Sequence, residues 1–261
     1  MALNYHRAGS GPPLVLIHGI GSRWQVWEPV LERVAAERDV VAIDLPGFGA
    51  SPMPPPGTPA GMESLTRLVI EFCSDIGFTR PHVAGNSLGG WISLELARQG
   101  AVRSATALSP AGFHNRTEAV YQRASLWMAA RGARLLAPRA DRLAASPGWR
   151  KALFGQMAAR PENVPAADVG PTLHALANAP WFDETLTALI NQRFTGGEQI
   201  AVPVTIAWGE RDRLLLPRQA PRAGRRVPRA RMVTEWGCGH VPTYDDPEQI
   251  ARILLEGSAA G

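Results

Sequence analysis

The chain has 261 residues, of which 45% are hydrophobic, and its formal net charge is +4 at neutral pH. A chain of this length buries about three quarters of its unfolded surface, which is enough for one sizeable core. No stretch approaches the roughly eighteen apolar residues of a membrane span, and the first twenty residues lack the pattern of a secretion signal. Cys73 and Cys238 fit neither a disulfide framework nor a metal motif. We therefore expect a cytoplasmic protein without a membrane partner.

Short apolar and β-branched runs recur along the chain, and helix-like segments follow them. The runs that predict strands cover residues 14–19, 40–45, 82–85, 104–110, 202–209 and 231–236. Segments with apolar residues at helical spacing cover residues 24–37, 62–77 and 87–100. Strand alternating with helix is typical of the α/β class, with a mostly parallel twisted sheet and helices on both of its faces.

This alternation stops after residue 112. About ninety residues without a clear strand pattern precede the strand at 202–209, which is too long for a structureless loop. Their composition is helical, notably at 117–136 and 149–159. We expect residues 113–199 to form an inserted helical cap, or lid, on a core made of residues 1–112 and 200–261.

The first glycine-rich turn follows the strand at 14–19 and reads HGIGSRW. Gly19 and Gly21 begin like a dinucleotide-binding fingerprint, but Trp24 stands near the place where close helix packing requires a third glycine. The pattern therefore argues against a nicotinamide or flavin cofactor. We interpret His18 as a structural residue that orients this loop.

A serine follows the strand at 82–85 in the sequence HVAGNSLGGW. Gly85-x-Ser87-x-Gly89 predicts a sharp strand-to-helix turn, in which small residues are needed because the backbone is strained and packs closely. The helix that begins there directs free N–H groups, including that of Leu88, at negative charge near the serine. A glycine-rich turn that only packs well is the alternative.

The whole chain resembles the α/β-hydrolase family, and GNSLGG is a form that the nucleophile elbow of this family often takes. The resemblance implies the order nucleophile, acid, histidine. Ser87 matches the nucleophile, Asp212 in ERDRLLLP matches the acid, and His240 in GCGHVPTYDDP matches the histidine. In such a triad His240 accepts the serine proton, and Asp212 orients and stabilises the imidazole.

Three other carboxylates compete with Asp212 for the role of the acid: Glu210, Asp245 and Asp246. Some family members carry the acid after the preceding strand, but LSPAGFH contains no carboxylate. This absence favours Asp212.

The resemblance also implies an oxyanion hole made by the backbone N–H groups of Ile20 and Leu88. One such donor typically contributes about 10²- to 10³-fold in rate. The remaining histidines show no spacing that suggests a metal site, so we expect neither a metal nor a cofactor.

Large apolar residues in the 113–199 segment and beside the motifs predict a pocket for a hydrophobic substrate. The candidates are Trp91, Phe113, Trp127 and Trp181, although such residues more often hold a cap to its core. Serine at the elbow separates the chain from epoxide hydrolases and haloalkane dehalogenases of this fold, which carry aspartate there. We expect a carboxylesterase-like hydrolase of a small hydrophobic ester or related acyl compound. A carbon-carbon bond hydrolase of ring-cleavage products and a non-hydrolytic or ligand-binding relative remain alternatives.

The densest basic segment, RQAPRAGRRVPRAR, covers residues 218–231. It has no interleaved aromatic residues on which bases would stack. We expect a solvated surface there and no nucleic-acid partner.

Overall fold

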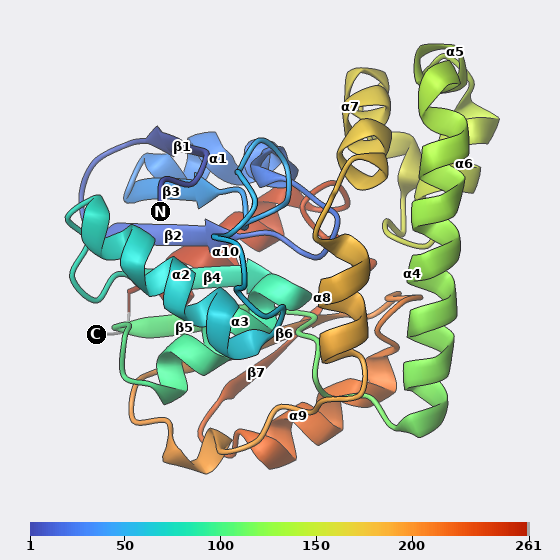
Figure 1. The fold of residues 1–261 in the computed structure, drawn as a ribbon. Helices are drawn as coiled ribbons and strands as arrows, with labels where there is room; N and C mark the ends of the chain where they lie inside the picture. Colours follow the sequence, from blue (N-terminus) through green and yellow to red (C-terminus); the bar gives the residue numbers. More distant parts are fainter. Residues whose placement is uncertain (260–261) are drawn as a thin grey trace.

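A seven-stranded sheet forms the centre of the computed structural model, which describes residues 1–259 apart from the side chain of residue 141 (Figure 1). The strands are β1 (Tyr5–Ala8), β2 (Pro13–Ile17), β3 (Asp39–Ile43), β4 (His82–Asn86), β5 (Ser104–Leu108), β6 (Val204–Gly209) and β7 (Arg231–Glu235). Their order is β1-β3-β2-β4-β5-β6-β7, and only the β1–β3 pair is antiparallel. The predicted α/β class with a mostly parallel sheet is confirmed.

Alternation along the strands builds a hydrophobic core on each face of the sheet. Val15 and Ile17 of β2 belong to one core, and Leu14 and Leu16 belong to the other. The first core includes buried residues of α2 (Met62–Asp75), α3 (Leu88–Arg98) and α9 (Ala220–Arg226). The second includes those of α1 (Glu28–Ala35) and α10 (Pro247–Gly257). Both faces of the sheet are therefore covered, as a parallel sheet requires.

The edge strand β1 was missed by the sequence analysis. Its residues, YHRA, alternate between exposed and half-buried positions and contain no apolar run. It pairs with β3 from Tyr5 opposite Ile43 to Ala8 opposite Val40. An edge strand with one partner needs fewer apolar residues, so its sequence carries a weaker signal.

Between β5 and β6 the chain folds into helices at one end of the sheet, to the right in Figure 1. They are α4 (Arg116–Leu136), α5 (Ala140–Ala144), α6 (Pro147–Phe154), α7 (Ala166–Ala177) and α8 (Phe182–Leu189). A separate small core, which includes Ala133, Phe154, Val169 and Leu173, joins α4, α6 and α7. The helix α4 begins with a capping box between Asn115 and Glu118, which satisfies two otherwise free N–H groups.

Arginines of the basic segment hold the beginning of α4 against the core. Arg218 and Arg222 both donate hydrogen bonds to the buried carboxylate of Glu118. Arg226 donates to the carbonyl oxygen of Gly112, at 3.0 Å, and to that of Phe194, at 3.2 Å. Arg218 is exposed, as expected of a solvated surface, whereas Arg222 and Arg226 are half-buried against their partners, so for these two the expectation is wrong.

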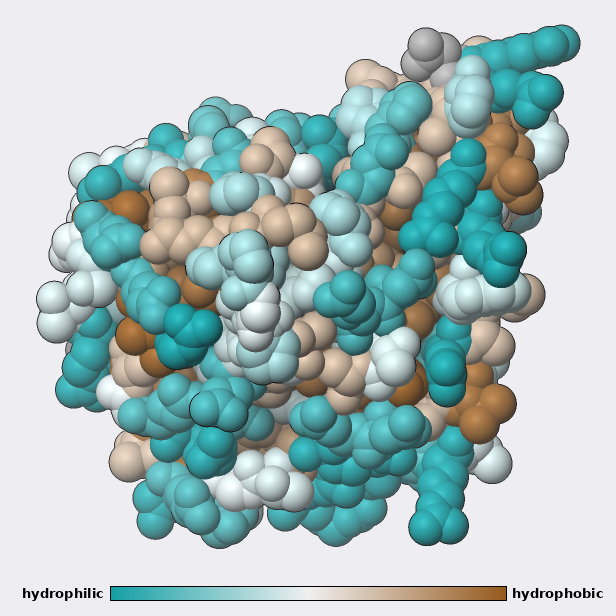
Figure 2. All heavy atoms as spheres, viewed as in Figure 1, coloured by the Kyte–Doolittle hydropathy of each residue, from teal (hydrophilic) through white to brown (hydrophobic). Residues whose placement is uncertain are grey.

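Polar residues dominate the visible face of the molecule (Figure 2). Hydrophobic patches reach the surface on both sides of this view. The exposed hydrophobic side chains include Val120, Met128 and Leu135 of α4. Among the helices of residues 1–259, none combines the length and the hydropathy that a membrane-crossing segment needs.

Candidate active site

Ser87 occupies a strained turn between β4 and α3. Its φ and ψ angles are 57° and −113°, and a positive φ in a residue other than glycine costs about 1–3 kcal/mol. Backbone hydrogen bonds hold the turn: Ser87 N–H donates to Leu108 at 2.9 Å, and the Ser87 carbonyl accepts from Trp91 and Ala111 at 3.1 and 3.0 Å. The predicted strand-to-helix elbow is present, and its serine lies at the carboxyl edge of the sheet.

The glycines around Ser87 are required because backbones approach one another. A methyl group on Gly85 would lie 2.2 Å from the carbonyl of Gly89, and one on Gly89 would lie 2.1 Å from the carbonyl oxygen of Ile17. A methyl group on Gly19 would lie 3.2 Å from the Ser87 Cβ. The elbow therefore packs directly against β2 and the turn that follows it.

His240 and Asp212 meet beside this turn, although they are 28 residues apart in the sequence. The His240 Nδ1 lies 2.8 Å from Asp212 Oδ2, and both side chains are almost completely buried. The other oxygen, Oδ1, accepts hydrogen bonds from the backbone N–H groups of Leu214 and Leu215, each at 2.8 Å. These bonds fix the orientation of the carboxylate toward the imidazole.

Asn86 ties the histidine loop to the elbow. Its Nδ2 donates to the carbonyl oxygen of His240 at 2.8 Å and to that of Leu108 at 3.2 Å. Ser87 and His240 line the same cavity, while no direct hydrogen bond joins their side chains among the described residues. In hydrolases without substrate the serine–histidine bond is often long and shortens when substrate binds.

The competing carboxylates are engaged elsewhere. Asp245 accepts three backbone N–H groups, Asp246 caps the first turn of α10, and Glu210 accepts a backbone N–H of the next loop. Among the described residues, Asp212 is the carboxylate that bonds to the His240 ring.

Glu235, at the end of β7, is fully buried, and neither of its carboxylate oxygens has a hydrogen-bond partner within residues 1–259. Burial, followed by the nearby charges of Asp212 and Asp245, raises the pKa of Glu235 well above its ordinary value. Burial therefore disfavours a second negative charge next to Asp212. The burial of Glu235 was not predictable from the sequence, because a glutamate at a strand end is usually exposed.

His18 orients the turn that precedes Ile20, as the sequence indicated. Its Nε2 accepts the backbone N–H of Leu45 at 2.9 Å, so its Nδ1 carries the proton and donates to the Gly19 carbonyl at 2.7 Å. Burial lowers the pKa of His18, which keeps the ring neutral. The same carbonyl accepts the Ser22 N–H at 3.2 Å. Because the peptide is trans, the N–H of Ile20 points away from these partners.

The backbone N–H groups of Ile20 and Leu88 lack acceptors within the described residues. Leu88 is the first residue of α3, whose initial N–H groups have no acceptor within the helix. In residues 1–259 neither N–H donates a hydrogen bond. Ile20 lines the cavity, whereas the Leu88 side chain belongs to the core.

The cavity beside Ser87 has a volume of about 410 Å³. Its walls come from the turn at 19–23, the histidine loop and the helices α4, α6 and α7. Apart from Phe154 and Tyr244, its larger apolar side chains are aliphatic or methionine, including Leu126, Met128, Leu153, Met157 and Leu176, and its long polar side chains are Arg23, Gln25 and Gln156. The sequence predicts aromatic residues for this wall, but aliphatic residues and methionine form most of its apolar part.

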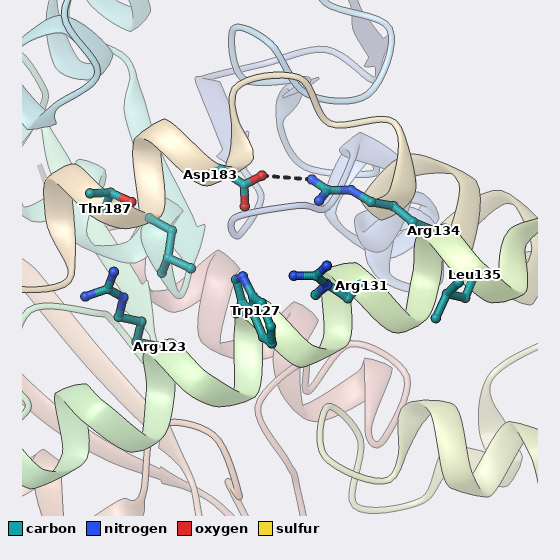
Figure 3. A pocket seen from close by; sticks show the side chains of 8 residues that line it. Arg123, Trp127, Arg131, Arg134, Leu135, Asp183 and Thr187 are labelled. Atoms are coloured by element: carbon teal, nitrogen blue, oxygen red, sulfur yellow. Dashed lines mark hydrogen bonds and ion pairs between the residues drawn. The ribbon is translucent and has the colours of Figure 1, made fainter.

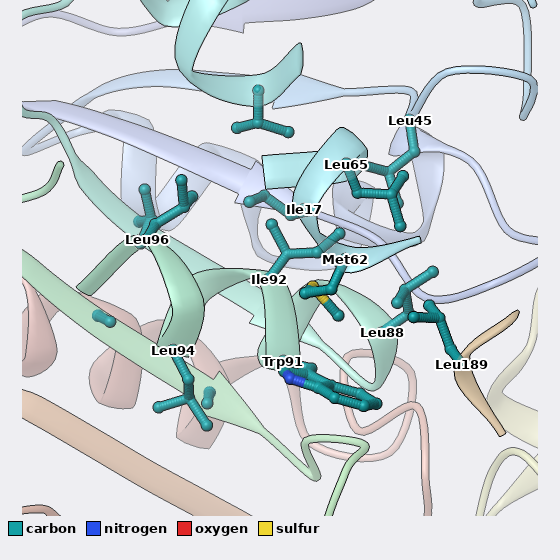
Figure 4. Packing of buried hydrophobic residues seen from close by; sticks show 14 of the residues in the cluster. Ile17, Leu45, Met62, Leu65, Leu88, Trp91, Ile92, Leu94, Leu96 and Leu189 are labelled. Carbon is teal, nitrogen blue, oxygen red and sulfur yellow. The ribbon is translucent and has the colours of Figure 1, made fainter. Parts of the chain in front are cut away.

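The four aromatic pocket candidates do not line this cavity, so the prediction for them is wrong. Trp91 packs among core residues (Figure 4) and donates a hydrogen bond to Glu95. Phe113 packs against the rings of two core residues, Phe194 and Trp208. Trp181 is buried and donates to Glu184. The first three therefore hold elements together, and Trp127 faces another groove.

That groove lies between α4 and α8 and has a volume of about 500 Å³ (Figure 3). The guanidinium of Arg131 lies 4.4 Å from the centre of the Trp127 ring, and Arg134 pairs with Asp183 at 3.0 Å. Neither Ser87 nor His240 contributes to this groove.

The chain belongs to the alpha/beta hydrolase family, whose model matches residues 14–253. An epoxide hydrolase of Mycobacterium tuberculosis is 30% identical over 193 residues, which cover 69% of this chain and 86% of that protein. The structure of a bacterial membrane phospholipase A superposes with a TM-score of 0.77 at 26% identity. The match covers 99% of this chain and 84% of the phospholipase chain. The structure of a meta-cleavage product hydrolase from Pseudomonas fluorescens superposes with a TM-score of 0.74 at 20% identity. The match covers 97% of this chain and 93% of that hydrolase. The last likeness shows the fold alone. The family membership inferred from the elbow and the motif order is confirmed, and the chain is a hydrolase.

Proposed function

We propose that this hydrolase cleaves a small hydrophobic ester, or a related acyl compound, with Ser87, His240 and Asp212 as its catalytic triad. The observation that carries the proposal is the 2.8 Å bond between His240 and Asp212 at the cavity that Ser87 lines from its strained turn. A nucleophile, a base and a residue that orients the base are the parts that covalent acyl transfer needs.

In the proposed reaction the Ser87 Oγ attacks the carbonyl carbon while His240 Nε2 accepts the hydroxyl proton. The carbonyl oxygen becomes negatively charged and accepts hydrogen bonds from the N–H groups of Ile20 and Leu88. The tetrahedral intermediate collapses when His240 returns the proton to the leaving alkoxide. Water, activated by the same imidazole, then attacks the acyl-enzyme and releases the acid.

The cavity supports a substrate with an apolar part. Aliphatic side chains of α4, α6 and α7, among them Leu126, Leu153 and Leu176, line it together with Ser87. We therefore propose that residues 113–199 act as a cap on the core of residues 1–112 and 200–261. The free, buried thiols of Cys73 and Cys238 are compatible with the proposed cytoplasmic location.

A carbon-carbon bond hydrolase remains the second candidate, because the same triad and the shared fold of the meta-cleavage product hydrolase suit both reactions. We do not propose epoxide hydrolysis, because Ser87 stands at the elbow position where epoxide hydrolases of this fold carry aspartate.

The proposal is tested by hydrolysis of p-nitrophenyl esters from acetate to decanoate. The wild type should show an optimum chain length, and Ser87→Ala should lower kcat by several orders of magnitude without unfolding. Ser93→Ala is the matched control: the Ser93 hydroxyl bonds to the Gly89 carbonyl at 2.8 Å, and Ser93 does not line the cavity. Turnover that survives in Ser87→Ala would refute the assignment. A folded wild type that cleaves no ester but cleaves a ring-cleavage product would establish the carbon-carbon reaction.

A further inference from the structure

A single permanent charge faces the cavity beside Ser87. Among the described residues that line this cavity, Arg23 is the one with a permanently charged side chain. It follows the Ile20 turn by three residues, so it belongs to the segment that also carries a proposed oxyanion donor. Most of the remaining wall is apolar, and in such surroundings a guanidinium attracts an anion more strongly than it does in water.

Arg23 has no acidic partner in the part of the chain that the structure describes. No carboxylate lies within 4.0 Å of its guanidinium, although many other arginines of the fold are paired. Its Nη1 lies 3.2 Å from the amide oxygen of Gln25 when that amide is oriented to accept the bond. Two acidic residues, Asp168 and Glu28, lie close enough to Tyr244 that their charges, like that of Arg23, shift the pKa of its hydroxyl. Neither of them forms an ion pair with Arg23. Most of the donors of the guanidinium are therefore free.

Arg23 belongs to the walls of two neighbouring cavities. The second cavity, of about 350 Å³, shares Arg23, Gln25 and Ala175 with the first. Its remaining wall includes His174 and Asn178 of the α7 end and Asp44, whose carboxylate already accepts the backbone N–H groups of Trp24 and Ala50. Arg23 therefore stands where an apolar chamber meets a more polar one.

We propose that the substrate carries a carboxylate in addition to its apolar part, and that Arg23 binds this carboxylate and determines specificity. The inference rests on the proposed acyl hydrolysis at Ser87. A guanidinium binds a carboxylate through two parallel hydrogen bonds, which neither lysine nor glutamine reproduces. Uncharged esters fill the same chamber but leave Arg23 without a partner.

The test compares pairs of esters that differ only in charge. One set contains mono-p-nitrophenyl esters of succinate, adipate and suberate, each beside its half-amide. A second set places the charge on the leaving group, with 4-carboxyphenyl hexanoate beside 4-carbamoylphenyl hexanoate. The wild type should favour the anion in at least one pair by about 10- to 100-fold in kcat/KM, the range of a charged hydrogen bond.

Arg23→Gln should bring that ratio close to 1 while kcat/KM for the neutral partner stays within about twofold of wild type. Arg33→Gln, on the exposed side of α1, removes the same net charge and should preserve the ratio. Equal rates for both members of every pair in the wild type would overturn the inference. Equal losses on neutral and anionic esters in Arg23→Gln would also overturn it, because they indicate a structural effect.

Calorimetry separates this inference from the proposed reaction. On the Ser87→Ala background, adipate monoamide and adipamide are titrated with and without Arg23→Gln. Tighter binding of the anion that disappears in Arg23→Gln supports the inference even if no ester is cleaved. Equal binding of the two amides overturns it even if esters are cleaved efficiently.

Discussion

Replacing Asp212 with asparagine changes one atom, and the structure predicts how the new amide orients. Two backbone N–H groups, from Leu214 and Leu215, converge on Oδ1 at 2.8 Å each. The amide oxygen must take this place, because an NH₂ group there would face two donors. The new NH₂ group then faces the Nδ1 of His240, 2.8 Å away in the wild type, and donates to it. The imidazole is therefore held with its proton on Nε2, where it cannot accept the proton of Ser87.

The expected loss in kcat for Asp212→Asn is about 10⁴-fold, or about 5 kcal/mol in the activation free energy. The assay is p-nitrophenyl ester hydrolysis followed from pH 6 to pH 10, with circular dichroism to verify folding. Asp245→Asn is the matched control, because the Asp245 carboxylate accepts three backbone N–H groups and does not bond to His240. This control should lower stability by about 1–3 kcal/mol and kcat by less than tenfold. Activity of Asp212→Asn within tenfold of wild type would refute the reasoning and move the acid to another carboxylate.

Three further predictions concern packing and the cap. Gly89→Ala should lower the free energy of unfolding by at least about 3 kcal/mol, because the methyl would lie 2.1 Å from the Ile17 carbonyl oxygen. Gly132→Ala, which has open space around it, is the control and should not destabilise the protein in the same thermal melts. Glu118→Gln should cost about 3 kcal/mol at pH 7, because it leaves Arg218 and Arg222 without their buried carboxylate. Burial alone would raise the pKa of Glu118, but hydrogen bonds from its partners, that of Arg222 first, lower it below its ordinary value. This stabilisation is present above pH 4.5 and is lost as the pH falls through the lowered pKa, so variant and wild type should converge in acid. Trp127→Ala should leave kcat/KM for neutral esters within about twofold, since its side chain faces the outer groove; a tenfold rise in KM would place it at the substrate.

The sequence predicted the positions around Ser87 well because they depend on local order along the chain. A serine between glycines directly after an apolar run, and loops after two later runs, must meet at one edge when the strands are parallel. The contacts that position the loops were not predictable in this way. Asn86 bonds to the carbonyl of His240 across 154 residues, and no motif announces such a contact.

The cavity wall was mispredicted for a physical reason. Whether a large side chain faces a cavity or the core depends on the rotation of its helix, which neighbouring elements set. Trp91 follows the elbow by one helical turn but points into the core, whereas Leu126 on α4 lines the cavity. The sequence shows that a side chain is large and hydrophobic, but this property suits a core position and a cavity wall equally well.

The loop that carries His240 is bonded to the wall of the cavity, and this limits how the molecule can open. The carboxylate of Asp245 accepts N–H groups from residues 159 and 160 and from Gly239, and the N–H of Val241 donates to the carbonyl of residue 157 at 2.7 Å. A hinge motion that lifts residues 157–160 must break these bonds or carry the imidazole away with them. Substrate that entered by that route would displace His240, the proposed base. The conformation that admits substrate would then differ from the one in which His240 accepts the proton of Ser87, unless the substrate enters by another route.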